Sequence, residues 1–142
     1  MYATVDDMVT RFGTTELAQL TDRVNKPASA VDAAVVTRAL ADADALIDGY
    51  IAKVYRLPLS QVPEILAKYA ADIARYYLHG KAAEKDGPIL RAYDQALTWL
   101  RDVSRGLVQI DVGGTAPEQP AGGTIQASGP DRLFTRDSLR GL

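Results

Sequence analysis

The chain has 142 residues, of which 47% are hydrophobic and 24% are charged, and its formal net charge is −2. This length and composition suit one folded domain, and the absence of cysteine excludes disulfides, thiolate metal sites and cysteine nucleophiles. The weakly acidic balance gives no general attraction to nucleic acid or anionic membranes, no apolar run approaches the roughly 18 residues that span a bilayer, and the first residues do not have the pattern of a signal peptide.

Two short helices are expected at the start of the chain. Thr4 and Asp7 have the spacing of a capping box and open a helix that ends at Gly13. A second short helix is expected over about residues 15–20, followed by a loop over residues 24–28. Two helices around a glycine loosely resemble the start of a helix-turn-helix motif, although the second helix contains no Lys or Arg for DNA contacts. A small DNA-binding regulator is therefore kept as the alternative function.

The longest predicted helix spans residues 30–55 and is opened by Ser29 with Asp32. At 1.5 Å per residue it would be about 39 Å long. Its apolar residues recur at alternating steps of four and three, which places them on one continuous seam. The seam consists of Val36, Leu40, Ala43, Ile47, Tyr50 and Val54. The pair Leu57–Pro58 ends this helix, because a residue before proline is disfavoured in the α conformation.

Two further helices complete the body. Pro63 suits the first turn of a helix that ends at Gly80, and Pro88 opens a last helix that ends at Gly106. Residues 107–112 alternate apolar and polar side chains, which predicts a short strand. The expected fold is a mainly α, small helical bundle with one long helix, a short C-terminal strand and a flexible C-terminal arm.

The composition changes near residue 110. Residues 111–142 contain six of the 11 glycines and three of the seven prolines, a composition typical of flexible linkers. The segment 131–140 then mixes charge with large apolar side chains, which suits an arm that docks on a partner. We therefore assign residues 1–110 to a helical domain and residues 111–142 to a Gly/Pro-rich linker and C-terminal arm.

The sequence offers few groups for catalysis. The single histidine, His79, lies at a predicted helix end, where it would bond terminal carbonyls and interact with the helix dipole. Asp44 and Asp48 lie four residues apart on a predicted water-facing stripe, where a solvated surface, or a pair with an arginine of a neighbouring subunit, is the simpler interpretation. A metal-dependent enzyme that uses these two carboxylates is the weakest alternative. We expect no enzymatic activity, no cofactor and no metal.

Several stretches carry a resemblance to a known family through their order along the chain. They are MYATVDDM with RFG (residues 1–8 and 11–13), LTDR (20–23), ADALIDGYI with YRLPL (43–51 and 55–59), DIARYYL (72–78) and RLFTRDSLRG (132–141). Together they resemble the phage Mu-like family of small virion proteins, catalogued as of unknown function and found in tailed phages and prophages. The resemblance implies a head–tail connector, or neck protein, that is mostly helical, forms a ring beneath the portal, extends the DNA channel and docks the tail.

The resemblance also implies the partners and the location. The expected partners are further copies of the chain, with a dodecameric ring as the candidate assembly, and the portal and tail or neck proteins of the phage. Sequence-specific nucleic acid and membranes are not expected as partners. The expected location is the head–tail junction of the virion, after a stay in the host cytoplasm during assembly. The candidate interface residues are Tyr50, Tyr55, Arg56, Tyr76, Tyr77, Arg132, Leu133, Phe134, Arg136 and Leu139.

Overall fold

The computed structural model describes residues 1–113 of the chain. These residues form five α-helices and a short 3₁₀ helix, and they contain no strand, so the mainly α prediction is confirmed. The elements are α1 (Val5–Phe12), α2 (Thr14–Thr21), α3 (Ala33–Ile51), α4 (Glu64–His79), η1 (Gly80–Ala82) and α5 (Pro88–Ser104). No helix in this part of the chain has both the length and the hydropathy of a bilayer-spanning segment.

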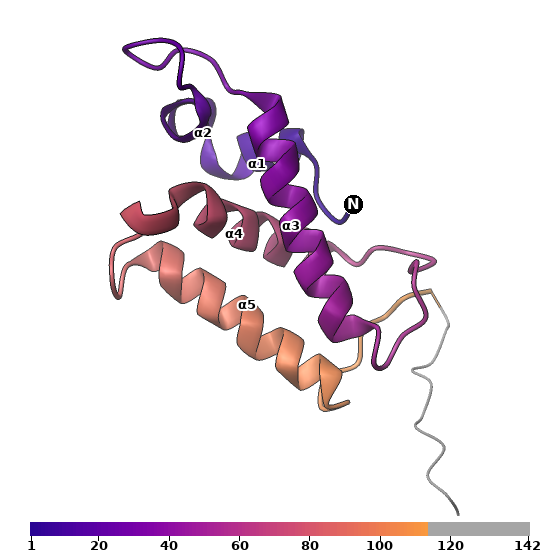
Figure 1. Cartoon of the computed structure of the whole chain (residues 1–142). Coiled ribbons are helices and arrows are strands. Elements are labelled where there is room, and N and C mark those ends of the chain that lie inside the picture. The colour runs from indigo at the N-terminus through magenta and orange to yellow at the C-terminus, as the bar shows by residue number, and fades with distance from the viewer. Residues whose placement is uncertain (114–142) are drawn as a thin grey trace, which may run out of the picture.

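The first two helices begin and end as the local signals predict. Thr4 and Asp7 form the capping box, with the Asp7 carboxylate accepting from the Thr4 N–H at 2.7 Å and the Thr4 hydroxyl accepting from the Asp7 N–H at 3.2 Å. Gly13 then separates α1 from α2 with a φ of 84°, a left-handed conformation that favours glycine. Both helices lie beside the N-terminal end of α3 (Figure 1).

The long helix is shorter than predicted at both ends. It begins at Ala33 because Asp32 is its N-cap and accepts from the N–H groups of the first turn. Ser29 and the residue after it are held outside the helix, because their N–H groups donate to the carboxylate of Asp22. The helix ends at Ile51, and 19 residues at 1.5 Å each give a length of about 28 Å.

The core lies between α3, α4 and α5, where α3 packs beside α4 and α4 packs beside α5 (Figure 1). The first four seam residues of α3, from Val36 to Ile47, are fully buried, whereas Tyr50 and Val54 are only half-buried at the edge of the core. Ile51 is buried in their place. The α-helical period of 3.6 residues moves the buried face away from a seam drawn with a strict period of 3.5.

The predicted strand over residues 107–112 is wrong. This segment has no strand partner among the described residues and runs as irregular chain across the end of the bundle. Its buried side chains are Ile110 and Val112, which belong to the core cluster. The backbone is held by side chains, since the Ile110 N–H donates to the Tyr55 hydroxyl at 2.7 Å and the Ser60 hydroxyl donates to the Val112 carbonyl at 2.6 Å. The alternation of residues 107–112 thus reflects one-sided burial without a sheet.

Candidate functional site

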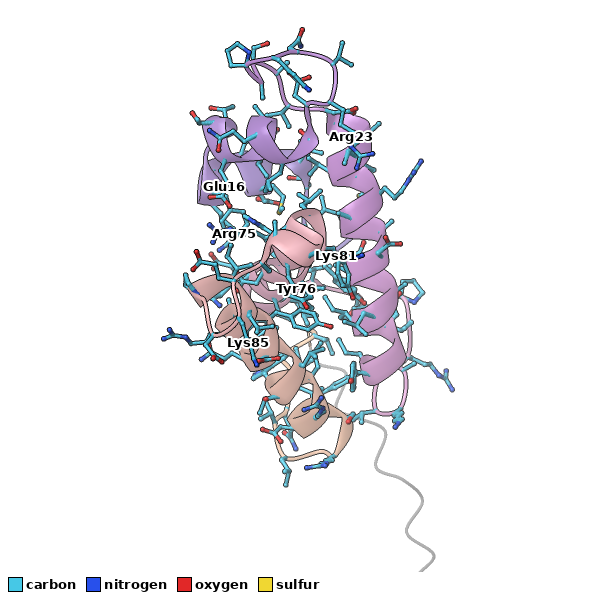
Figure 2. The ribbon with its side chains drawn as sticks, turned by 60° about the vertical axis from the view of Figure 1, so that its left-hand side comes forward. Glu16, Arg23, Arg75, Tyr76, Lys81 and Lys85 are labelled. Atoms are coloured by element: carbon cyan, nitrogen blue, oxygen red, sulfur yellow. The ribbon has the colours of Figure 1, made fainter. Side chains whose placement is uncertain are left out.

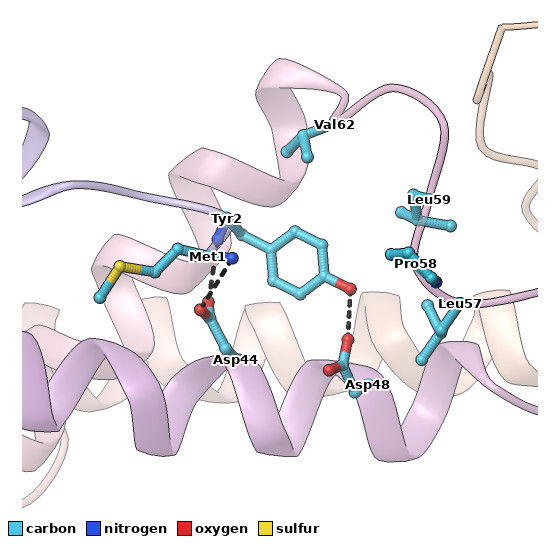
Figure 3. Close-up of a pocket in the computed structure, with 8 residues that line it drawn as sticks. All are labelled: Met1, Tyr2, Asp44, Asp48, Leu57, Pro58, Leu59 and Val62. Carbon is cyan, nitrogen blue, oxygen red and sulfur yellow. Dashed lines mark hydrogen bonds and ion pairs between the residues drawn. The ribbon is translucent and has the colours of Figure 1, made fainter.

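An open groove lies between the N-terminal segment and the loop that follows α3. It has a volume of about 550 Å³ and is lined by Met1, Tyr2, Asp44, Asp48, Leu57, Pro58, Leu59 and Val62. Figure 3 shows the Tyr2 ring lying over α3, with the side chains of the loop beside it. Three lining residues are exposed large hydrophobics: Met1 at 67%, Val62 at 46% and Leu57 at 36%. A gathering of exposed apolar side chains in a concave region is typical of an interaction site.

The paired carboxylates of α3 hold the N-terminal segment in place. Asp44 accepts from the Tyr2 N–H at 3.1 Å and lies 3.6 Å from the N-terminal ammonium, while Asp48 accepts from the Tyr2 hydroxyl (Figure 3). Burial, together with the hydrogen bond to Asp48, raises the pKa of Tyr2 well above its usual range. The interpretation of this pair as a solvated surface is wrong, because both aspartates are half-buried and bound to the chain's own N-terminus.

The second charged cluster joins α2 to α4. Arg75 donates from Nε and Nη2 to the two carboxylate oxygens of Glu16 at 2.6 and 2.8 Å (Figure 2). His79 Nε2 lies 3.2 Å from Glu16 Oε1. Burial raises the pKa of Glu16, but the hydrogen bonds from Arg75 and His79 outweigh it and lower the pKa overall. His79 therefore contacts a side chain of another helix, where terminal carbonyls were expected. Spacing along the chain gives no signal for a contact of this kind.

The tyrosines of α4 pack against α5. The rings of Tyr76 and Tyr93 are stacked with centroids 4.1 Å apart, and Tyr77 lies tilted beside Tyr93 at 6.1 Å. Burial, with Tyr93 and Asp42 nearby, raises the pKa of Tyr77 to about 12. Tyr76 and Tyr77 are half-buried, so each has part of its ring in the bundle and part at the surface. Both stay predicted interface residues.

The other predicted interface residues fall in three different environments. Tyr50 is half-buried on α3, and Arg56 is exposed in the loop that follows it. Tyr55 is only 5% exposed, and its hydroxyl accepts from the Ile110 N–H, so its ring serves the core of its own chain. The predicted arm residues Arg132, Leu133, Phe134, Arg136 and Leu139 lie outside the described residues. Met1, Tyr2 and Val62 were not among the site residues predicted from the sequence. The apolar turn around Pro58 was nevertheless a signal for the loop side of the groove.

A second, smaller hollow lies where α2, α3 and α4 meet. It has a volume of about 170 Å³, and its polar lining residues are Arg23, Arg38, Asp42 and Tyr77. Of these, Arg38 is exposed on α3. Among residues 1–113, no group of three or more His, Asp or Glu side chains is arranged to hold a metal ion.

Similarity to known proteins shows which family this chain belongs to. The model of the bacteriophage Mu gp36 family matches residues 2–128. The chain belongs to this family. It is 34% identical over 136 residues to gene product J of Escherichia phage Mu, covering 95% of this chain and 94% of that protein. It is 30% identical over 110 residues to the Mu-like prophage FluMu protein gp36 of Haemophilus influenzae, covering 78% and 75% of the two chains. The resemblance carried by the sequence motifs is confirmed.

Proposed function

We propose that this protein is a structural component of the virion, namely a head–tail connector that forms a ring beneath the portal and docks the tail. The observation that carries the proposal is the family match, which runs along residues 2–128 and joins the chain to proteins of phage Mu and a Mu-like prophage. The mainly helical body agrees with the helical connectors that the family resemblance implied.

The distribution of polar and apolar groups supports a non-enzymatic role. Asp44 and Asp48 bind the N-terminal segment, and Glu16 binds Arg75 and His79, so these charged groups connect elements of their own chain. The exposed large hydrophobics of the groove offer apolar area for contacts with other proteins. A weakly acidic chain also suits a conduit, because DNA that passes through it should not be gripped.

The helix-turn-helix alternative gains no support from the geometry of α2. The exposed residues of this helix are Thr14, Thr15 and Gln19, none of which is charged. Its Glu16 points to Arg75 of α4, which fixes that face against the body (Figure 2). A recognition helix depends on phosphate and base contacts from Arg, Lys, Asn or Gln, and one glutamine is a poor basis for them.

The function is tested by deleting the gene from the phage or prophage and examining the induced particles by electron microscopy. We expect DNA-filled heads without tails, or heads that have lost their DNA, and restoration of tailed particles by the wild-type gene supplied in trans. A matched control is complementation with Ala45→Ser, which changes an exposed residue of α3 that does not line the groove and should restore tails fully. Normal tailed particles from the deletion would overturn the proposal.

A further inference from the structure

The groove beside Tyr2 has an open apolar side that no described element covers. Met1, Leu57 and Val62 remain exposed around it, while Asp44 and Asp48 form its polar floor on α3 (Figure 3). Its volume of about 550 Å³ falls in the range of about 300–1,000 Å³ that holds a small organic ligand, which is room for a few large side chains. We propose that residues 131–140 of a neighbouring copy of this chain occupy the groove, with Leu133 and Phe134 as the anchors.

The first support is the place where the described chain ends. The Val112 carbonyl accepts from the Ser60 hydroxyl at 2.6 Å, and Gly113 lies against Gln61. A Cβ on Gly113 would stand only 3.1 Å from the Gln61 side chain. Since Gln61 directly precedes Val62, the chain leaves the body at the loop that forms one wall of the groove (Figure 1).

The second support is chemical complementarity. The segment 131–140 reads DRLFTRDSLR, with three arginines, two aspartates and the apolar residues Leu133, Phe134 and Leu139. Its apolar side chains match the exposed apolar wall of the groove, and its excess of positive charge matches the carboxylates of the floor. Large apolar residues with arginines beside them are the pattern of interface anchors and their rim.

The third support is the length of the connection. Residues 114–130 lie between the described body and the segment, and 17 residues reach at most about 60 Å at 3.3–3.6 Å each. Gly113 contacts Gln61, the neighbour of the lining residue Val62, so 17 residues are more than a return to the groove of the same copy needs. A body of this size has a radius of gyration of about 13 Å, which puts the equivalent groove of an adjacent copy within that reach. Exchange of arms between neighbours is a head-to-tail contact, the kind of contact that closes rings.

This inference rests on the proposed ring, and the absence of cysteine allows a direct test on the full-length chain. Three single variants, Val62→Cys, Leu57→Cys and Phe134→Cys, are purified separately under reducing conditions. Each groove variant is mixed with Phe134→Cys and oxidised, and mixed disulfide dimers are followed by non-reducing electrophoresis. Val24→Cys, at a position that is 90% exposed and outside the groove, is the matched control partner.

The proposal predicts that both groove variants form mixed dimers with Phe134→Cys at least about tenfold faster than the control, because docking raises the local concentration of the two thiols. Equal rates for groove and control would overturn it. So would a disulfide that forms only within single molecules of the double variant Val62→Cys/Phe134→Cys. Light scattering on the wild-type chain distinguishes failure of this inference from failure of the proposed function. If the chain forms rings but the groove variants give no cross-links, only the assignment of the arm to the groove is rejected. If the cross-links form but the protein is dispensable for tailed particles, only the connector function is rejected.

Discussion

Removal of the Tyr55 hydroxyl is expected to destabilise the body without disturbing its surface. The ring is 5% exposed, and the hydroxyl accepts from the Ile110 N–H at 2.7 Å. Tyr55→Phe keeps the ring in place but takes the acceptor away from a buried backbone donor. Leaving such a donor unpaired costs about 1–3 kcal/mol of the free energy of unfolding.

The assay is thermal and urea unfolding followed by far-ultraviolet circular dichroism. For a body of this size the loss corresponds to a fall in Tm of about 4–13 °C, since 1 kcal/mol shifts the Tm of a domain of about 110 residues by about 4 °C. Tyr50→Phe is the matched control, because Tyr50 is half-buried at the edge of the core and its hydroxyl has no hydrogen-bond partner among residues 1–113. Its free energy of unfolding should change by less than about 0.5 kcal/mol.

Equal Tm values for the two tyrosine variants would refute this reasoning, because they would mean that the segment containing Ile110 is not docked on Tyr55. A variant Tyr55→Phe with unchanged stability but weakened self-association would instead support the sequence-based prediction of Tyr55 as an interface residue. Measuring stability and self-association on the same preparations therefore distinguishes a core role from an interface role.

Three further changes test other parts of the body. Ile47→Ala should lower the free energy of unfolding by about 2–5 kcal/mol in a urea titration, because it opens a cavity at a fully buried site of α3, whereas the exposed Ala45→Ser should change it by less than about 0.5 kcal/mol. Glu16→Gln should be less stable than the wild type near neutral pH, and the difference should shrink as the pH falls below the ordinary carboxyl pKa of 4.5. The sign follows from the pKa of Glu16, which is lower in the folded state than in the unfolded state. The charged carboxylate therefore stabilises the fold above the unfolded-state pKa, and this stabilisation is lost as the pH falls through the folded-state pKa. A difference between the two proteins that grows in acid would contradict this. A chain that stops after Gly113 should unfold at the wild-type Tm, whereas a chain that stops after Gln109 lacks two buried core residues and should unfold at a lower Tm; equal Tm values would show that these residues do not belong to the body.

Helix beginnings were predictable because their signals are local. The capping box of Thr4 and Asp7 and the prolines before α4 and in the first turn of α5 act within a few residues of chain. The bounds of α3 were not, because they depend on distant partners. The carboxylate of Asp22 accepts from the N–H groups of residues 29 and 30, which would otherwise extend the start of α3. Beyond the end of α3, the Tyr55 hydroxyl accepts from the Ile110 N–H.

The groove was beyond the reach of sequence patterns for the same reason. The spacing of Asp44 and Asp48 correctly puts both carboxylates on one face of a helix, but nothing near them in the chain identifies Tyr2 as their partner. The tie between Glu16 and Arg75 joins residues 59 positions apart. The family, in contrast, could be recognised from ordered short motifs, because these carry common descent whether or not their contacts are known.

The most direct test of the connector proposal is a cryo-electron microscopy reconstruction of the head–tail junction in virions of a phage that encodes this chain. The connector proposal predicts a ring of density between portal and tail into which copies of the helical body, residues 1–113, fit with α3, α4 and α5 resolved. Purified, fully tailed virions in which mass spectrometry detects no trace of the protein, and whose junction holds no density of this shape, would contradict it.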